Sequence, residues 1–165
     1  CRGGRRMHSY VFALAGEGDA AEVLALYRSL IGTPGCTWDL DYPDGETVLR
    51  DIAEGSLYLL RQGDRIVSAA AAGQSDELAA LDWRAKNPCD LARIGVLADC
   101  QRRGVGTRML RSVVEAVRAR GFDGIRILVA RDNARALALY DKNGFCRGRA
   151  VRMFDLDFYC YERVF

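Results

Sequence analysis

Histidine is nearly absent from this sequence, whose 165 residues include only His8. The six cysteines contain no CxxC pair, whereas structural zinc sites draw on closely spaced cysteine and histidine ligands. We therefore expect no bound metal, and we expect the cysteines to serve as small apolar residues in a reducing compartment, with a stray disulfide left open. A Ser-His or Cys-His nucleophile pair is also disfavoured, because His8 falls within residues 1–8, which we interpret as a mobile leader or an expression remnant.

Long apolar runs and a strong charge imbalance are missing as well. No run approaches the length of a membrane span, and the start lacks the pattern of a signal peptide. The formal net charge of +2 is too small to indicate a nucleic-acid partner. Arg2, Arg5 and Arg6 form a basic run, for which a solvated tail is the favoured interpretation. The sequence thus predicts a soluble cytoplasmic protein with no membrane or nucleic-acid partner.

The bulk composition suits one globular domain over residues 1–165. With 50% hydrophobic and 28% charged residues, the chain can bury a continuous core. Apolar spacing and turn residues predict strands and helices in alternation, with no repeat or linker. The expected strands are residues 10–14, 57–61, 65–72, 91–97, 124–130, 149–156 and 158–164. The expected helices are residues 19–30, 46–54, 105–120 and a segment that begins after 132 or 133 and closes at 144. Residues 31–45 read as loop, and residues 76–88 as loop or ragged strand.

The stretch QRRGVGTRML, residues 101–110, places Gly104 and Gly106 at the start of an expected helix. A helix N-terminus presents unpaired backbone N–H groups and a partial positive charge, so anions bind there readily. Glycine lacks the Cβ that would hold a phosphate away. A Rossmann or P-loop nucleotide site is the rival interpretation, but the third glycine of GxGxxG and the Gly-Lys-Ser/Thr sequence are both missing.

Two motifs together resemble those of the GNAT N-acetyltransferase superfamily. The family's pyrophosphate signature, (Arg or Gln)-x-x-Gly-x-(Gly or Ala), is matched by Gln101, Gly104 and Gly106. Its downstream pattern, Asn-x-x-Ala-x-x-x-Tyr-x-x-x-Gly-Phe, is matched by Asn133, Ala136, Tyr140, Gly144 and Phe145. The resemblance implies the GNAT fold, an α/β (α+β) architecture. In it a mixed sheet of six to seven strands with a splayed central pair is flanked by about four helices.

The resemblance also implies acetyl-CoA as the co-substrate. Backbone N–H groups of residues 101–107 would wrap its pyrophosphate, and Arg102, Arg103 and Arg108 would add positive charge nearby. The implied binding residues of this loop are Gln101, Arg102, Arg103, Gly104, Val105, Gly106 and Thr107.

The splayed strands would be residues 91–97 and 124–130, with the pantetheine arm inserted between them. Gly95 fits the splayed position, and an ordinary weak point in a strand is the alternative. Backbone groups of Ile94 and Val96 would bond the arm and place one N–H at the thioester oxygen. Asn133 matches a position that often contacts the cofactor, and helix capping explains it equally well.

The implied reaction is direct attack of a primary amine on the thioester, which needs a base and an acid. Tyr140 matches the family's frequent acid, with a core tyrosine as the alternative. Asp90 occupies the place of the glutamate base of histone-acetylating members. Because aspartate is shorter by one methylene, it would act through a water or not at all. A solvated loop carboxylate is the favoured alternative.

The acceptor is left open between a small-molecule amine and a peptide amine. Ribosomal-protein alanine N-acetyltransferases usually carry a Leu-Glu-Val-Arg strand, whereas residues 127–130 read ILVA, which weakens an N-terminal peptide acceptor. Candidate pocket walls are Tyr42, Trp83, Tyr159 and Tyr161. A homodimer is also left open. The alternative function is a domain that binds acyl-CoA only to sense it, and Tyr140 favours catalysis because a sensor needs no acid.

Overall fold

Seven strands form one sheet in the order β1-β2-β3-β4-β5-β7-β6. The computed structural model describes residues 9–165, so the predicted leader, with His8 and the basic run, lies outside the described residues. Only β4 and β5 run parallel, and the other neighbours pair antiparallel. The strands are β1 (Tyr10–Leu14), β2 (Leu57–Gln62), β3 (Arg65–Gly73), β4 (Pro88–Val96), β5 (Gly124–Ala130), β6 (Cys146–Met153) and β7 (Leu156–Val164). The predicted mixed sheet is confirmed.

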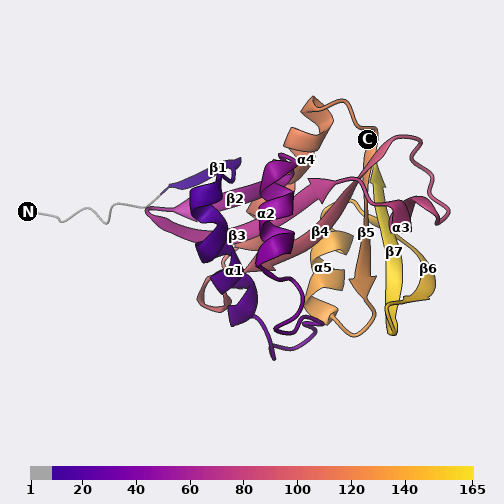
Figure 1. Ribbon diagram of the computed structural model, residues 1–165. Coiled ribbons are helices and arrows are strands. Elements are labelled where there is room, and N and C mark those ends of the chain that lie inside the picture. Colours follow the sequence, from indigo (N-terminus) through magenta and orange to yellow (C-terminus); the bar gives the residue numbers. More distant parts are fainter. Residues whose placement is uncertain (1–8) are drawn as a thin grey trace, which may run out of the picture.

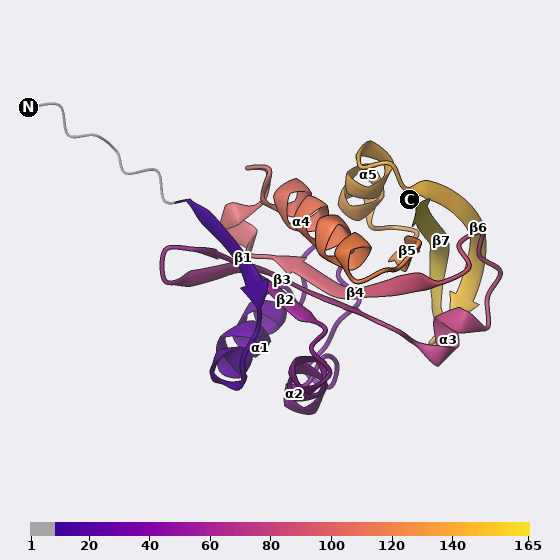
Figure 2. The same ribbon diagram turned by 90° about the horizontal axis from the view of Figure 1, so that it is seen from above.

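Helices cover both faces of this sheet. Figure 2 shows α4 and α5 on one face and α1, α2 and α3 on the other. The helices are α1 (Ala20–Ser29), α2 (Gly45–Ala53), α3 (Asp76–Ala79), α4 (Val105–Ala119) and α5 (Ala134–Lys142), and two short 3-10 turns are η1 (Glu17–Asp19) and η2 (Ala98–Cys100). In α4, apolar residues recur every three or four positions, so one face is buried over its whole length.

Two core clusters result, one on each face of the sheet. The larger lies under α4 and α5, and the smaller packs α1 and α2 against β2 and β3. Strand β3 serves both: Ala70 and Ala72 face the larger cluster, while Ala69 faces the smaller. Because alanine is small, helices approach this strand closely from either side.

Several bounds and one element differ from the sequence prediction, and three of these differences are instructive. Strand β4 begins at Pro88, because its first residues pair with β5. Residues 76–79 form the short helix α3 where a loop or ragged strand was expected. The last hairpin turns at Phe154 and Asp155, with φ of 53° and 59°, so Leu156 already belongs to β7. A turn with two left-handed residues matches the strand twist, but phenylalanine gives little sequence signal for it.

Candidate active site

Strands β4 and β5 are in contact at one end only. Their ladder consists of Pro88, Cys89 and Asp90 facing Gly124, Ile125 and Arg126. Beyond it, β4 stays paired with β3 as far as Val96, and β5 stays paired with β7 as far as Ala130. Figure 1 shows the two strands side by side at one end and running apart toward the other. The facing edges therefore present backbone groups that an extended ligand can bond as a strand would.

A β-bulge in β4 accompanies this separation. Ala69 of β3 faces Gly95, but Ala71 faces Ala92, so β4 has one extra residue between these pairs. Within it, Arg93 has φ 48°, a left-handed conformation that is uncommon for any residue but glycine. The bulge re-aims the strand at the place where it leaves β5.

Gly95 lies directly after the bulge, and its missing side chain has a local reason. A Cβ there would stand 2.9 Å from Leu30 Cδ1 and 3.3 Å from Leu26 Cδ2. Helix α1 therefore packs onto the strand at this point. The glycine thus permits a close contact between helix and sheet, and its predicted splayed position stays a prediction.

The loop after β4 leads into α4 with an open, left-handed turn. Gly104, the N-cap of α4, has φ 78°, and a Cβ on it would have no neighbour within 4 Å. Arg102 is also left-handed, at φ 63°. The side-chain amide of Gln101 donates to the Val96 carbonyl at 3.1 Å, which ties the loop to the end of β4.

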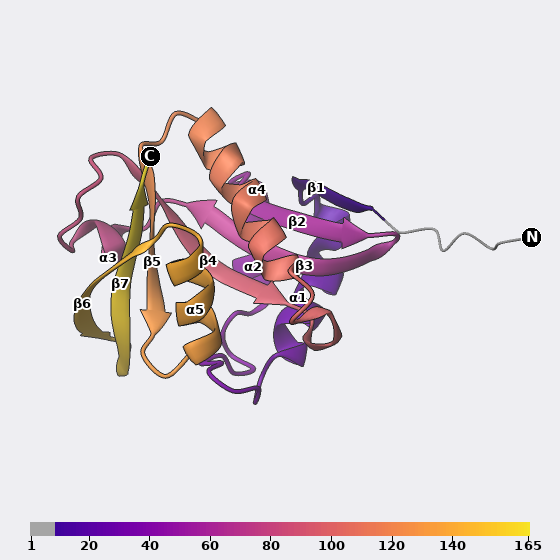
Figure 3. The same ribbon diagram turned by 180° about the vertical axis from the view of Figure 1, so that it is seen from behind.

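The electrostatics of this helix start favour an anion. No side chain caps it and its first turn contains no acidic residue, so its N–H groups and positive dipole end face outward. Arg102 and Arg103 are exposed beside it. Arg108 instead stacks on the Tyr10 ring, with its Cζ 4.8 Å from the centroid. Figure 3 shows α4 and α5 from their own side of the sheet, with the loop at the start of α4.

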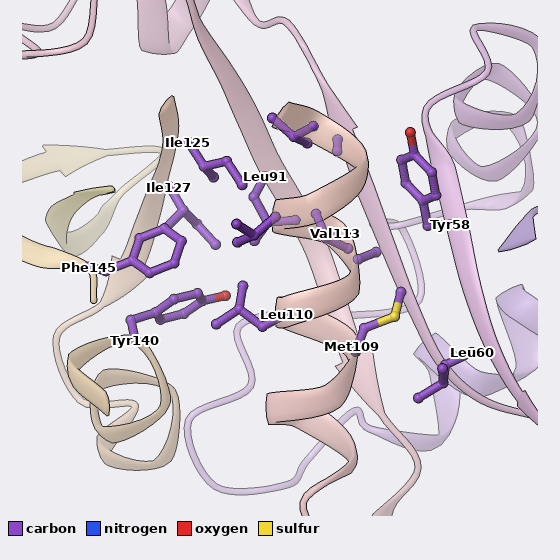
Figure 4. Close-up of a cluster of buried hydrophobic side chains, with 14 of the residues drawn as sticks. Tyr58, Leu60, Leu91, Met109, Leu110, Val113, Ile125, Ile127, Tyr140 and Phe145 are labelled. Atoms are coloured by element: carbon purple, nitrogen blue, oxygen red, sulfur yellow. The ribbon is translucent and has the colours of Figure 1, made fainter. Parts of the chain in front are cut away.

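Tyr140 lies on α5, 1% exposed, inside the larger core cluster. Its ring packs edge-on against Phe145, with centroids 5.2 Å apart. Figure 4 shows the hydroxyl directed toward Leu110 of α4. That hydroxyl has no hydrogen-bond partner among the described residues, and burial raises its pKa. Tyr140 is thus a core residue, as one of its two interpretations predicts, and its hydroxyl has no acceptor in the part of the chain that the structure describes; its role as the acid stays a prediction.

Asn133 caps α5, as one of its two interpretations predicts. Its Oδ1 accepts from the Ala136 N–H at 3.1 Å. The residue also contacts the loop after α1, where a Cβ on Gly35 would stand 2.7 Å from Asn133 Cγ. This loop therefore reaches across the sheet to the start of α5.

Asp90 is not a solvated loop carboxylate. It is 4% exposed and belongs to the paired end of β4. Its Oδ1 accepts from Arg126 Nε, and its Oδ2 accepts from Arg126 Nη2 at 3.2 Å and from the Ser75 N–H. Arg126 is itself 7% exposed and lies over the Trp83 ring. Asp90 is therefore a buried carboxylate paired with Arg126, and the interpretation as a solvated loop residue is wrong.

The four aromatic residues proposed as pocket walls do not converge. Tyr42 contacts Arg93 near α2, and Trp83 stacks on Arg126. Tyr161 is buried in the larger core cluster, where its hydroxyl donates to Asp141 at 2.9 Å. A different group lies near Tyr42 and was not predicted from the sequence: a buried pair formed by Asp51 and Arg93. The sequence hint to this pair is that Asp51 stands three positions after Val48, on the buried face of α2.

The cysteines and acidic residues add no further centre in residues 9–165. Cys36, Cys89, Cys100, Cys146 and Cys160 are free thiols. No group of three potential metal ligands gathers in this part of the chain. Among its helices, none has the length and apolar character to cross a membrane.

Known proteins match the chain in both sequence and structure. The family model described as Acetyltransferase (GNAT) family matches residues 23–145. A GNAT-family acetyltransferase from Streptococcus agalactiae superposes with a TM-score of 0.82 at 19% identity, covering 96% of this chain and 97% of that chain. The ribosomal-protein-S18-alanine N-acetyltransferase from Escherichia coli gives 0.73 at 19% identity, with 94% of each chain covered. A Salmonella typhimurium protein, solved with its cofactor acetyl-CoA, gives 0.74 at 15% identity and covers 94% of this chain and 93% of that chain.

One curated relative shares a short segment. The mycothiol acetyltransferase of Beutenbergia cavernae is 40% identical over 52 residues, which are 32% of this chain. The matched segment is 18% of that protein's length. The chain therefore matches only a small part of this relative, and the likeness does not carry over its acceptor.

Proposed function

The chain belongs to the GNAT family of acetyltransferases, and we propose that it transfers the acetyl group of acetyl-CoA to a primary amine of a small molecule or peptide. The observation that carries this proposal is the opening between β4 and β5, which leads to an uncapped helix start with no acidic residue in its first turn. An extended anionic thioester fits such a site, because unpaired strand edges accept a backbone-like arm and a helix start accepts phosphate.

Two features of the described residues support acetyl-CoA as the occupant. Nothing in the protein would meet a Cβ at Gly104, so a phosphate can approach the backbone there. The Tyr140 hydroxyl is buried without a partner, as expected of a donor whose acceptor arrives with the ligand. Bound acetyl-CoA supplies an activated acyl group and a thiolate leaving group. We assign its pyrophosphate to the N–H groups of residues 101–107, and its arm to the backbone of Ile94 and Val96.

Within this site, Tyr140 holds a proton at Oη. The hydroxyl is protonated at neutral pH, as an ordinary tyrosine is. Burial raises its pKa further and makes it a weaker acid, so its proton would pass to the departing sulfur only if bound acetyl-CoA lowered that pKa. Asn133 keeps the start of α5 in place through its Oδ1, which leaves its side-chain NH₂ free for a cofactor contact. The acid thus comes from α5 and the anion site from α4.

The reaction also needs an acceptor for the ammonium proton. Asp90 remains the candidate from sequence, yet Arg126 and the Ser75 N–H already engage both carboxylate oxygens. We therefore favour water as the acceptor of the ammonium proton, with Asp90 holding β4 and β5 together. The predicted cytoplasmic location and a homodimer remain predictions.

A thiol-release assay with acetyl-CoA and a panel of small amines and N-terminal peptides tests the proposal. Turnover with at least one amine supports an enzyme. Tight acetyl-CoA binding in calorimetry without turnover on any amine would instead favour the sensor alternative. The panel also decides between small-molecule and peptide acceptors. We expect a small-molecule acceptor, because residues 127–130 lack the glutamate of the Leu-Glu-Val-Arg strand.

The loop itself is tested at Gly104. We expect Gly104→Glu to weaken acetyl-CoA binding by about 10- to 100-fold, because the new carboxylate would repel the phosphates and its Cβ would block the backbone approach. Gly104→Asn is the matched control for charge, since asparagine tolerates the left-handed turn and adds a Cβ without a carboxylate; the difference between the two variants is the effect of repulsion. Calorimetry on both folded variants measures the effect, and equal affinities for Gly104→Glu and wild type would remove the loop from the site.

A further inference from the structure

A buried ion pair reaches from α2 into the bulge of β4. Asp51 Oδ2 accepts from Arg93 Nε at 2.8 Å, and Asp51 Oδ1 accepts from Arg93 Nη2 at 2.8 Å. The two parallel hydrogen bonds fix both the position and the orientation of the guanidinium plane. The pair therefore holds Arg93 more rigidly than a single contact would.

The fold gains little from this pair as a source of stability. Asp51 and Arg93 have side chains only 4% and 18% exposed, and burying two charges has a desolvation cost that an apolar pair avoids. Arg93 also keeps the unfavourable left-handed conformation, at φ 48°. The buried charge pair and the left-handed backbone thus coincide at Arg93, where β4 turns away from β5. Two unfavourable features at one residue indicate that the backbone geometry there is needed for something other than stability.

Two further hydrogen bonds fix the bulge of β4. Ser68, fully buried on β3, donates its hydroxyl to the Gly95 carbonyl at 2.7 Å. Arg93 Nη1 donates to the Tyr42 hydroxyl at 3.0 Å. The backbone from Arg93 to Gly95 is thereby fixed between α2 and β3, and the edge that faces the opening is fixed with it.

From this geometry we infer that Asp51 is a positioning residue for acetyl transfer, which acts through Arg93 to fix the bulge of β4. The inference rests on the proposed function, because the edge it orients includes Ile94, whose backbone we assign to the acyl donor. Asp51 touches neither reactant in this account. Its loss would misplace the strand edge while the anion loop at Gly104 stays in place.

The first test is steady-state kinetics of Asp51→Asn with one accepted amine. We expect kcat to fall by about 10- to 100-fold, since small displacements of a positioning group have effects of this size. The KM for acetyl-CoA should stay close to the wild-type value, because the loop dominates its binding. A wild-type kcat would overturn the inference. A raised KM for the amine with unchanged kcat would also overturn it, because the pair would then contact the acceptor.

A neutral double variant separates positioning from stability. Asp51→Asn leaves the buried Arg93 charge uncompensated and should lower Tm, whereas Asp51→Asn combined with Arg93→Met removes both charges and should recover much of it. We expect kcat of the double variant to stay low. If kcat recovers together with Tm, the pair is only structural.

A matched control comes from the ion pair between Asp19 and Arg61, which joins β2 to the turn before α1. Asp19→Asn should lower Tm with no change in kcat. The proposed function fails by itself if wild-type protein neither binds acetyl-CoA in calorimetry nor releases thiol, and the inference then falls with it. If wild type is active and Asp51→Asn is equally active, only the inference fails.

Discussion

Replacing Tyr140 with phenylalanine is expected to lower kcat by about 10²- to 10⁴-fold, the usual contribution of a general acid. The KM for acetyl-CoA should change little, because a proton donated to the developing thiolate contributes little to ground-state binding. Steady-state kinetics with one accepted amine measures both values. A variant that keeps wild-type kcat, with chemistry shown to be rate-limiting, would reduce Tyr140 to a packing residue.

The same substitution should not destabilise the protein. The Tyr140 hydroxyl is buried without a partner, so its removal deletes an unsatisfied polar group and leaves the ring contacts in place. Tyr27→Phe is the matched control, because its hydroxyl is also buried without a partner, in the other core cluster. Both variants should keep or raise Tm, but only Tyr140→Phe should lose activity. Equal losses of activity would point to general packing.

Alkaline pH gives a second readout of these hydroxyls. Burial raises the pKa of Tyr27 and of Tyr140, so folding favours their protonated forms. This contribution to stability is complete below the ordinary tyrosine pKa of about 10 and declines as the pH rises above it. We expect each phenylalanine variant to lose less unfolding free energy than wild type in urea titrations at pH values above about 10. Parallel losses would show that the hydroxyls are accessible to water.

The sequence predicts the parts of the fold that depend on local pattern. Strand β5 has the predicted bounds, and α4 begins at Val105 as predicted, because apolar spacing and flanking glycines act within a few residues. The final turn was misplaced, since Phe154 and Asp155 adopt left-handed conformations that their identities do not favour. Tertiary pairing of β6 with β7 decides that turn.

The candidate site divides in the same way. The loop from Gln101 to Thr107 and Tyr140 carry recognisable motifs, so their positions could be predicted. The bulge at Arg93 could not, because its ion pair joins residues 42 positions apart in the chain. The same holds for Asp90 and Arg126, which are 36 positions apart. Nothing near Asp90 in the sequence indicates that the fold brings the Arg126 guanidinium to it, so a solvated carboxylate was the favoured interpretation.

Asp90→Asn is expected to lower the free energy of unfolding by about 3–5 kcal/mol, because removing one partner of a buried pair leaves the other charge uncompensated. Both residues of the pair are more than nine-tenths buried, so water cannot replace the lost carboxylate. Typical domains have only about 5–15 kcal/mol of stability, so urea titration should show a large shift. A companion variant, Asp90→Asn with Arg126→Met, removes both charges and should recover much of the loss.

The activity of these variants decides the role of Asp90. If Asp90 only holds β4 to β5 through Arg126, then kcat/KM measured below the unfolding temperature should follow the same pH profile in wild type and in the companion variant. If Asp90 is the base, activity at neutral pH should fall in both variants and recover partly at high pH, where more of the substrate amine is already neutral. The engaged carboxylate leads us to expect superimposable profiles. A neutral-pH loss that high pH rescues would return Asp90 to catalysis, since restored packing cannot mimic that dependence.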